Sequence, residues 1–156
     1  MTTTTVIAPV QGRAVALADV PDPVFSGGMV GYGAAIDPPR TIVDAVAPVS
    51  GKILKLLPHA YVIMTADNVG VLVHLGLDTV QLNGAGFTAL AAQGDTVTAG
   101  QPVIIYDVPA IVAAGMSPIV PVVVMDERDP ANVAVSDAVA TAADISTGAP
   151  LFTAHK

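Results

Sequence analysis

Cysteine and tryptophan are both absent from this chain of 156 residues. The lack of cysteine excludes a disulfide, a thiolate metal site and a cysteine nucleophile. Charge is also scarce: only 12% of the residues are charged, and six basic side chains face 13 acidic ones, for a formal net charge of -7. Such a charge opposes phosphate backbones, and no basic cluster offsets it. We therefore expect no nucleic-acid partner.

Long hydrophobic runs are missing too, although 53% of the residues are apolar and the mean hydropathy is +0.67. The densest run, Ile119–Met125, is interrupted by Pro121 and is far shorter than the roughly 20 residues that a bilayer span needs. Met1 and the four threonines after it have neither the basic region nor the apolar core of a signal peptide. We expect a cytoplasmic protein with no direct membrane insertion.

Residues that usually fill exposed helix faces are rare, since the chain has one glutamate, three lysines and four glutamines. Short runs rich in valine, isoleucine and threonine are separated by 14 glycines and 13 prolines, which is typical of an all-β sandwich or barrel. We expect one or two short helices, at 107–115 with Asp107 as N-cap and at 87–93. Residues 7–156 are expected to form one domain after a short flexible tail at 1–6.

Two phrases that recur along the chain predict a duplicated motif. The sequence APVQGR at 8–13 returns as APVSGK at 47–52, and VTAGQPV at 97–103 returns as ISTGAPL at 145–151. In each phrase a glycine permits a turn, and in the second pair a proline stands where a strand begins. The unequal offsets argue against a solenoid. They favour a compact fold in which two similar β-motifs wrap together.

Three histidines are the first candidates for chemistry. His155 is next to last and is expected to fray. His59 and His74 flank two apolar strands joined by the turn-like segment TADNVG at 65–70. A two- or four-residue loop would place His74 opposite Tyr61 and His59 opposite Gly76, with both imidazoles on one sheet face and open space beside them.

Such a pair has three possible roles. One neutral imidazole could accept a phosphoryl group while its neighbour steadies the oxygens. The pair could instead be half of a zinc site, with Asp78 as third ligand. The third possibility is two structural histidines without chemistry. Spacing alone does not decide among them.

Six motifs stand in a characteristic order along the chain: DPVF at 22–25, APVSG at 47–51, His59-Ala60, LVHLGLDTV at 72–80, LNGAGF at 82–87 and GDTVTAG at 94–100. Together they resemble the glucose-type enzyme IIA (EIIA type 1) family of the bacterial phosphoenolpyruvate-dependent sugar phosphotransferase system, over about 7–151. This resemblance implies a flattened antiparallel β-barrel or sandwich made of a duplicated motif. The family often has phenylalanine near the histidines, where this chain has Leu57, Leu72 and Leu75, and the segment at 56–58 is shorter than in some relatives and lacks their threonine or asparagine.

The resemblance also implies a function in sugar uptake, as a phosphotransferase component. His74 would accept a phosphoryl group from the phosphocarrier HPr and pass it to a cysteine of the enzyme IIB domain of a sugar permease. His59 would support the transfer. Asp78 would lie at the partner-facing rim, and no cofactor would be needed.

A partner must bring its own histidine or cysteine within reach of His74, which predicts a concave, apolar and largely uncharged surface. Phe25, Leu72 and Val80 are the candidates for that rim. No permanently bound metal is expected, although His59 and His74 could hold adventitious zinc with a ligand from a partner.

Two other functional classes fit the sequence less well, and a third stays open. A zinc peptidase of related fold would need an H-x-x-x-D and an H-x-H motif, but Ile63 stands four residues after His59 and Gly76 replaces the second histidine. A biotinyl or lipoyl carrier would need a lysine at a hairpin tip, whereas Lys52 and Lys55 lie in a predicted strand. A regulatory binding protein that acts in its unphosphorylated form remains open.

Overall fold

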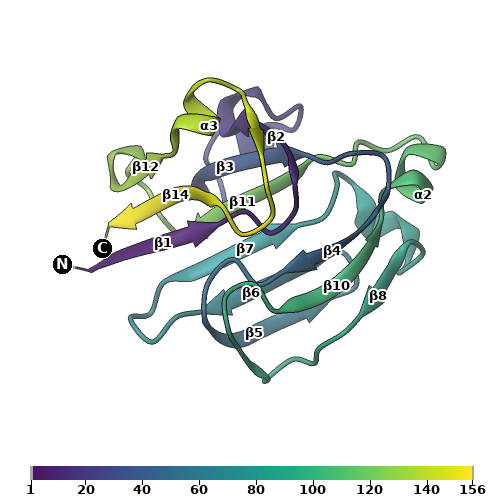
Figure 1. Cartoon of the computed structure of the whole chain (residues 1–156), viewed down its shortest axis with the longest axis horizontal. Coiled ribbons are helices and arrows are strands. Elements are labelled where there is room, and N and C mark those ends of the chain that lie inside the picture. The colour runs from purple at the N-terminus through teal and green to yellow at the C-terminus, as the bar shows by residue number, and fades with distance from the viewer. Residues whose placement is uncertain (1, 156) are drawn as a thin grey trace.

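The computed structural model describes residues 2–155, and antiparallel strands dominate it (Figure 1). The strands are β1 (Thr3–Ile7), β2 (Gly12–Ala16), β3 (Gly31–Asp37), β4 (Ile42–Val46), β5 (Gly51–Leu57), β6 (Ala60–Met64), β7 (Gly70–His74), β8 (Phe87–Ala89), β9 (Thr96–Val97), β10 (Pro102–Asp107), β11 (Val120–Met125), β12 (Val133–Val135), β13 (Asp144–Ile145) and β14 (Pro150–His155). The helices in the described part are α1 (Pro23–Ser26), α2 (Val108–Ala113) and α3 (Asp137–Ala140), with 3-10 turns η1 (Leu17–Asp19), η2 (Thr79–Leu82) and η3 (Pro130–Asn132). The predicted all-β class is confirmed.

Three sheets make up the described part of the fold. The largest has eight strands in the order β13-β2-β3-β11-β7-β6-β5-β9 and curls into half a barrel. Two three-stranded sheets, β1-β14-β12 and β4-β10-β8, complete the barrel wall. In Figure 1, β1 and β14 run side by side, and Thr3 at the start of β1 lies opposite His155 at the end of β14.

The duplicated motif is visible in equivalent hydrogen bonds. Ala8 N–H donates to the Ala149 carbonyl at 2.8 Å, and Ala47, its repeat equivalent, donates to Gln101 at 2.9 Å. The strands match as well, because β13 pairs with β2 just as β9 pairs with β5. Two backbone bonds join the repeats directly: Ile7 donates to Pro48, and Val46 donates to Pro9.

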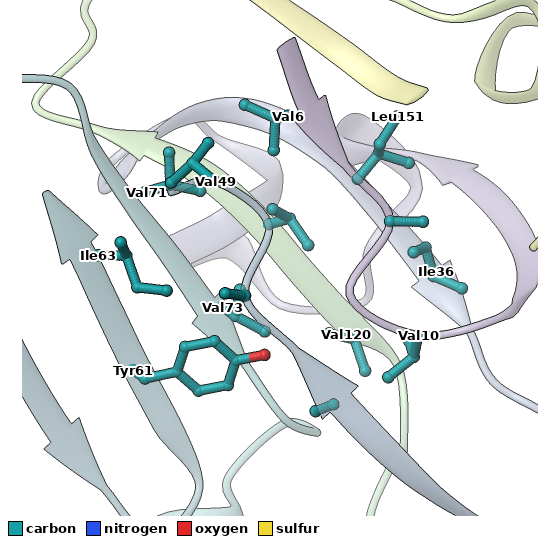
Figure 2. Close-up of a cluster of buried hydrophobic side chains, with 14 of the residues drawn as sticks. Val6, Val10, Ile36, Val49, Tyr61, Ile63, Val71, Val73, Val120 and Leu151 are labelled. Carbon is teal, nitrogen blue, oxygen red and sulfur yellow. The ribbon is translucent and has the colours of Figure 1, made fainter. Parts of the chain in front are cut away.

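The main core lies on the inner face of the large sheet, between it and the two smaller sheets. Figure 2 shows Tyr61 and Ile63 of β6 and Val71 and Val73 of β7 reaching the same interior as Val6 of β1. The hydroxyl of buried Tyr61 donates to the Val46 carbonyl at 2.7 Å, which satisfies its polar atom.

A second, smaller cluster lies on the outer face of the same sheet. Here the segment that contains η1 and α1 packs Leu17, Val20 and Phe25 over Ala35 of β3 and Val123 of β11. Strand alternation explains the two clusters, since neighbouring residues of β6, β7 and β11 point to opposite faces. His74 lies on this outer face, and its ring centroid is 5.2 Å from that of Phe25 in α1.

The structure corrects several local predictions. The expected flexible tail at 1–6 is wrong for Thr3–Val6, which form most of β1 and pair with β14. These β-branched residues favour an extended chain, and the edge of β14 gives them backbone partners. His155, expected to fray, lies in β14, and its Nδ1 is 3.3 Å from the Thr3 hydroxyl. Met1 and Lys156 lie outside the described residues.

The helix predictions were partly right. Helix α2 lies where it was predicted, and the Asp107 carboxylate caps it by accepting from Ala110 N–H at 3.2 Å. The segment at 87–93 instead begins with strand β8, because Phe87 stacks on Tyr106 and its neighbours pair with β10. Three short α-helices are present within 2–155 rather than one or two.

Within residues 2–155, no helix has both the length and the apolar character that crossing a bilayer requires.

Candidate functional site

His74 ends strand β7 on the outer face of the large sheet, and its side chain is half-buried. Its Nδ1 lies 2.6 Å from the carbonyl oxygen of Gly76. A carbonyl can only accept a hydrogen bond, so Nδ1 carries the proton and Nε2 keeps its lone pair. The hydrogen bond therefore selects the tautomer in which Nε2 is the available nucleophile.

The turn after His74 is built to present that carbonyl. Gly76 has a φ of +84°, and a Cβ there would lie 2.6 Å from the Thr79 methyl carbon and 3.1 Å from the Ser117 carbonyl oxygen. The buried Thr79 hydroxyl donates to the Leu75 carbonyl at 2.8 Å. Gly76 N–H donates to the Ile119 carbonyl at 3.1 Å, which ties the turn to the strand beside it. The predicted open space at Gly76 is wrong, because the turn is closely packed and only glycine fits it.

His59 occupies a position that the predicted register did not give it. The connection between β6 and β7 has five residues, so Ala60 rather than Tyr61 lies opposite His74. A one-residue shift between two strands would send the histidines to opposite faces. His59 escapes this rule because it lies in the two-residue turn between Leu57 and Ala60, before β6 begins.

The two imidazoles nevertheless meet, as predicted. Their ring centroids are 5.1 Å apart, and the rings cross edge-to-face at 72°. The His59 carbonyl accepts from Leu75 N–H at 2.7 Å, which holds the turn against the end of β7. Small Ala60, opposite His74, leaves room for both rings on this face. Phe25 of α1 closes the other side, 5.2 Å from the His74 ring centroid.

Burial lowers the pKa of both histidines below the ordinary value of 6.5. For His59, only 8% exposed, desolvation is the larger cause and the charge of His74 is the smaller one. For His74, burial lowers the pKa, while the Gly76 hydrogen bond and the carboxylates of Asp22 and Asp78 partly oppose it. Both rings are therefore neutral at pH 7, the form in which Nε2 of His74 can attack an electrophile.

The surface around the pair is apolar but not uncharged, which corrects the predicted rim. Val80 in η2 is 61% exposed, and Leu72 is half-buried beside His74 on the same face. Phe25 is only 6% exposed, so it serves as a wall behind His74 more than as a docking surface. Asp78 is exposed and acts on His74 through its charge, and so does Asp22.

Asp22 is the site residue that sequence reasoning missed. Its side chain accepts from Val24 N–H at 2.9 Å and caps helix α1, and Pro23 follows it at the first helical position. This Asp-Pro pair is a recognisable helix start. It predicts the helix but not that the helix brings a carboxylate to His74, because that depends on how α1 packs across the sheet.

A groove of about 230 Å³ extends from the histidine pair along the outer face of β5, β6 and β7. Its lining residues are Lys55, Leu57, His59, Ala60, Tyr61, Val62, Leu72, His74 and Met125. Within 2–155, no three histidine, cysteine or acidic side chains are placed to hold one metal ion, so Asp78 does not complete a zinc site with the pair.

Comparisons with known proteins agree with this arrangement. A family model described as "phosphoenolpyruvate-dependent sugar phosphotransferase system, EIIA 1" matches residues 4–129. The glucose-specific EIIA component of Oceanobacillus iheyensis is 36% identical over 141 residues, which cover 87% of this chain and 84% of that protein. The glucose-specific EIIA component of Bacillus cereus is 40% identical over 122 residues, 77% of this chain and 73% of that one.

Two further similarities bear on the fold and on domain context. The solved structure of glucose permease IIA from Mycoplasma capricolum superposes with a TM-score of 0.85 at 31% identity, covering 98% of this chain and 96% of that one. The mannose-specific EIIBCA component of Corynebacterium glutamicum is 40% identical over 119 residues, 76% of this chain but only 17% of that longer protein.

Proposed function

The chain belongs to the EIIA type 1 family of the phosphoenolpyruvate-dependent sugar phosphotransferase system, and we propose that His74 is its phosphoryl acceptor. The donor is phospho-HPr, and the next acceptor is the cysteine of an EIIB domain in a sugar permease. The observation that carries the proposal is the His74–Gly76 hydrogen bond, which leaves Nε2 unprotonated beside a second imidazole. The proposal places this exchange in the cytoplasm.

The acceptance step is an in-line displacement at phosphorus. The Nε2 lone pair of His74 forms the new N–P bond while the N–P bond to the HPr histidine breaks, and the bonding electrons return to the HPr ring. Nδ1 keeps its proton, so the phosphorylated ring of His74 carries a positive charge. The Gly76 carbonyl and the carboxylates of Asp22 and Asp78 stabilise that charge.

His59 supports transfer in this proposal without receiving the phosphoryl group itself. Its ring meets the His74 ring edge-to-face, and its lowered pKa keeps it neutral, with one N–H to donate and no positive charge beside the His74 imidazolium. A neutral donor at this position can steady the oxygens of the moving group. Its position in a tight turn, held by Leu75 N–H, keeps the ring in place during the transfer.

Docking uses the surface beside the pair. Leu72 is half-buried and lines the groove with His74. Val80 and Val24 are exposed apolar residues two positions along the chain from Asp78 and Asp22, the carboxylates whose charges act on His74. The carboxylates of Asp22 and Asp78 add negative charge near His74, which favours a partner with basic residues around its own reactive histidine or cysteine. Phe25 is buried and supports this surface by packing against the His74 ring.

Phosphorylation with purified components tests the proposal. The protein is incubated with labelled phosphoenolpyruvate, enzyme I and HPr, and the phosphate on it is located by peptide mapping under alkaline conditions. We expect one acid-labile phosphate at His74, and we expect it to move to EIIB when EIIB is added. A His155→Gln variant, changed at the remote end of β14, is the matched control and should be labelled like the wild type. Absence of acid-labile phosphate from the wild type would refute the proposal.

A further inference from the structure

We propose that Lys55 is the cation that binds the phosphoryl oxygens while His74 carries the group, an inference that rests on the function proposed above. Neither the family motifs nor the histidine chemistry points to this residue. The proposal comes from the groove that Lys55 shares with both imidazoles.

A β-bulge brings Lys55 to this face of the sheet. The β5–β6 pairing shifts register between Ile53 and Lys55, which leaves Leu54 as the extra residue. After the shift Lys55 lies opposite Val62, and Leu57 lies opposite Ala60. Residues opposite one another in an antiparallel pair share a face, and Ala60 in turn lies opposite His74. Lys55 and His74 are therefore on the same outer face.

The distance between them suits a lysine and a phosphorylated histidine. Lys55 is on β5, and β6 lies between β5 and β7. Along the strands, Lys55 is level with Leu72, two residues before His74. Ordinary sheet spacings then put the Cα atoms of Lys55 and His74 about 12 Å apart. A lysine stem and an imidazole on one face extend over most of that gap, and a phosphoryl group on Nε2 occupies the rest. Both side chains already border the same 230 Å³ groove.

Charge supplies the physical reason for a cation here. A phosphoryl group on His74 brings close to two negative charges into a site where the carboxylates of Asp22 and Asp78 already act on the ring. Among the residues that line the groove, Lys55 is the only lysine or arginine. Elsewhere in the described chain, Arg40 is paired with Asp37, and Arg128 donates to the Met29 carbonyl. Lysine binds phosphate as a mobile point charge, and exposed Lys55 is free to swing toward it.

Lys52 provides a matched control on the same strand. It precedes the bulge, lies opposite Met64, and borders a different depression with Thr65 and Asn68. Lys52→Met and Lys55→Met remove the same charge from the same exposed strand. Only the second removes it from the groove that holds His59 and His74.

The experiment is a pH titration of the phosphorylated protein followed by ³¹P NMR. Wild type, Lys55→Met, Lys55→Arg and Lys52→Met are each loaded with phosphoenolpyruvate, enzyme I and HPr. The ionisable groups around the phosphoryl group are Lys55 from β5, His59 from the β5–β6 turn, Asp22 at the start of α1 and Asp78 before η2. The Tyr61 hydroxyl faces the core instead.

We expect Lys55→Met to raise the pKa of the phosphorylated His74 ring, which the ³¹P shift follows, by about half a unit, because a nearby cation disfavours protonation of that ring. The equilibrium constant for loading from phospho-HPr should fall about two- to fivefold. Lys55→Arg and Lys52→Met should both behave like the wild type. Equal pKa values of the phosphorylated ring in wild type and Lys55→Met would overturn the assignment while leaving His74 as acceptor. A wild type that takes no phosphoryl group would refute the proposed function, and this inference with it.

Discussion

At His74, a single hydrogen bond gives the two ring nitrogens different roles. Nδ1 donates to Gly76, and Nε2 keeps its lone pair on a ring that borders the groove and meets the neighbouring imidazole. An imidazole without such a partner exchanges between tautomers, and its nucleophilic atom changes with them. In the proposed phosphorylated form, the Gly76 carbonyl would also stabilise the ring, because it accepts from the proton that stays on Nδ1.

The two histidines should respond differently to the same substitution. His74→Gln removes the nucleophile, and loading from phospho-HPr should be abolished. His59→Gln leaves the nucleophile in place, so loading should continue, but delivery to EIIB should slow by on the order of 10²–10³ if one stabilising donor is lost. Loading with labelled phosphate followed by addition of EIIB measures both steps. A His59 variant that cannot be loaded, beside a His74 variant that can, would reverse the two roles.

The lowered pKa values predict how the site titrates. Followed by NMR of the imidazole ring nitrogens, His59 and His74 of the unphosphorylated protein should both titrate with midpoints below 6.5. Asp78→Asn removes a carboxylate that raises the pKa of His74, so its midpoint should move lower still. A midpoint above 6.5 for either histidine would show that burial is not the dominant influence.

Stability should follow the same pKa values. Unfolded histidine has a pKa near 6.5, so below that pH the unfolded chain binds more protons than the folded protein. The contribution of each histidine to the free energy of unfolding is therefore complete above about pH 6.5. It is lost as the pH falls through the lower pKa that the histidine has in the folded protein. Urea unfolding measures this free energy at pH 7.5 and at pH 5. Between these two pH values, a variant with both histidines changed to glutamine should lose less free energy of unfolding than the wild type. An equal loss in both proteins would contradict this coupling.

At the scale of elements, the site depends on two turns and a short helix more than on strand alternation. The turn at Gly76 presents a carbonyl, the turn at 58–59 presents His59, and α1 brings Phe25 and Asp22 to the outer face. Strands β6 and β7 hold these pieces in register. Their inner faces are buried in the main core, so the site lies on a rigid support.

Substitution at Gly76 tests the first turn. Gly76 and Gly100 have similar positive φ values, +84° and +92°, but a Cβ at Gly100 meets nothing within 4 Å. Alanine at either position bears the backbone strain, whereas Gly76→Ala also collides with Thr79 and Ser117. We expect Gly76→Ala to lower the free energy of unfolding by about 1–3 kcal/mol more than Gly100→Ala. Equal losses in denaturant unfolding would show that the turn relaxes freely.

Periodicity and turn residues predicted much of this architecture. The repeated phrases correspond to equivalent turns with equivalent hydrogen bonds, and the Asp-x-Pro start of α2 was recognisable because capping is local chemistry. The β6–β7 register was not predicted correctly. The backbone of Thr65 and Val69 closes a five-residue loop, which composition does not distinguish from a shorter one. The meeting of His59 and His74 was predicted, but it arises from the β5–β6 turn and not from the expected register.

At the scale of the whole molecule, the two apolar clusters of the barrel have different roles. The larger one fills the interior between the sheets, and the smaller one fixes the segment at 17–25 over the outer face beside His74. Phosphoryl transfer between proteins needs a rigid nucleophile on an accessible surface, and this arrangement provides both. Lys55 borders the groove that His74 also lines, and the carboxylates of Asp22 and Asp78 act on the same ring from other elements.

Docking can be tested on that surface without disturbing the core. Val80→Asp adds a charge to the proposed docking surface, two residues from Asp78, and the initial rate of loading at low phospho-HPr should fall at least about fivefold. Val135→Asp is the control, since Val135 is 45% exposed on β12, outside the histidine groove. Both variants should unfold within about 0.5 kcal/mol of the wild type, as exposed substitutions usually do. Equal loading rates in the two variants would remove Val80 from the docking surface.

The central claim is that Nε2 of His74 carries the phosphoryl group, and the most direct measurement is the nitrogen–phosphorus coupling in the phosphorylated protein. The chain is labelled with ¹⁵N in its histidines, loaded from phosphoenolpyruvate through enzyme I and HPr, and recorded by ¹⁵N and ³¹P NMR. The structure predicts coupling of phosphorus to Nε2 of His74, with Nδ1 still protonated toward Gly76. Coupling to Nδ1, or to either nitrogen of His59, would contradict the account.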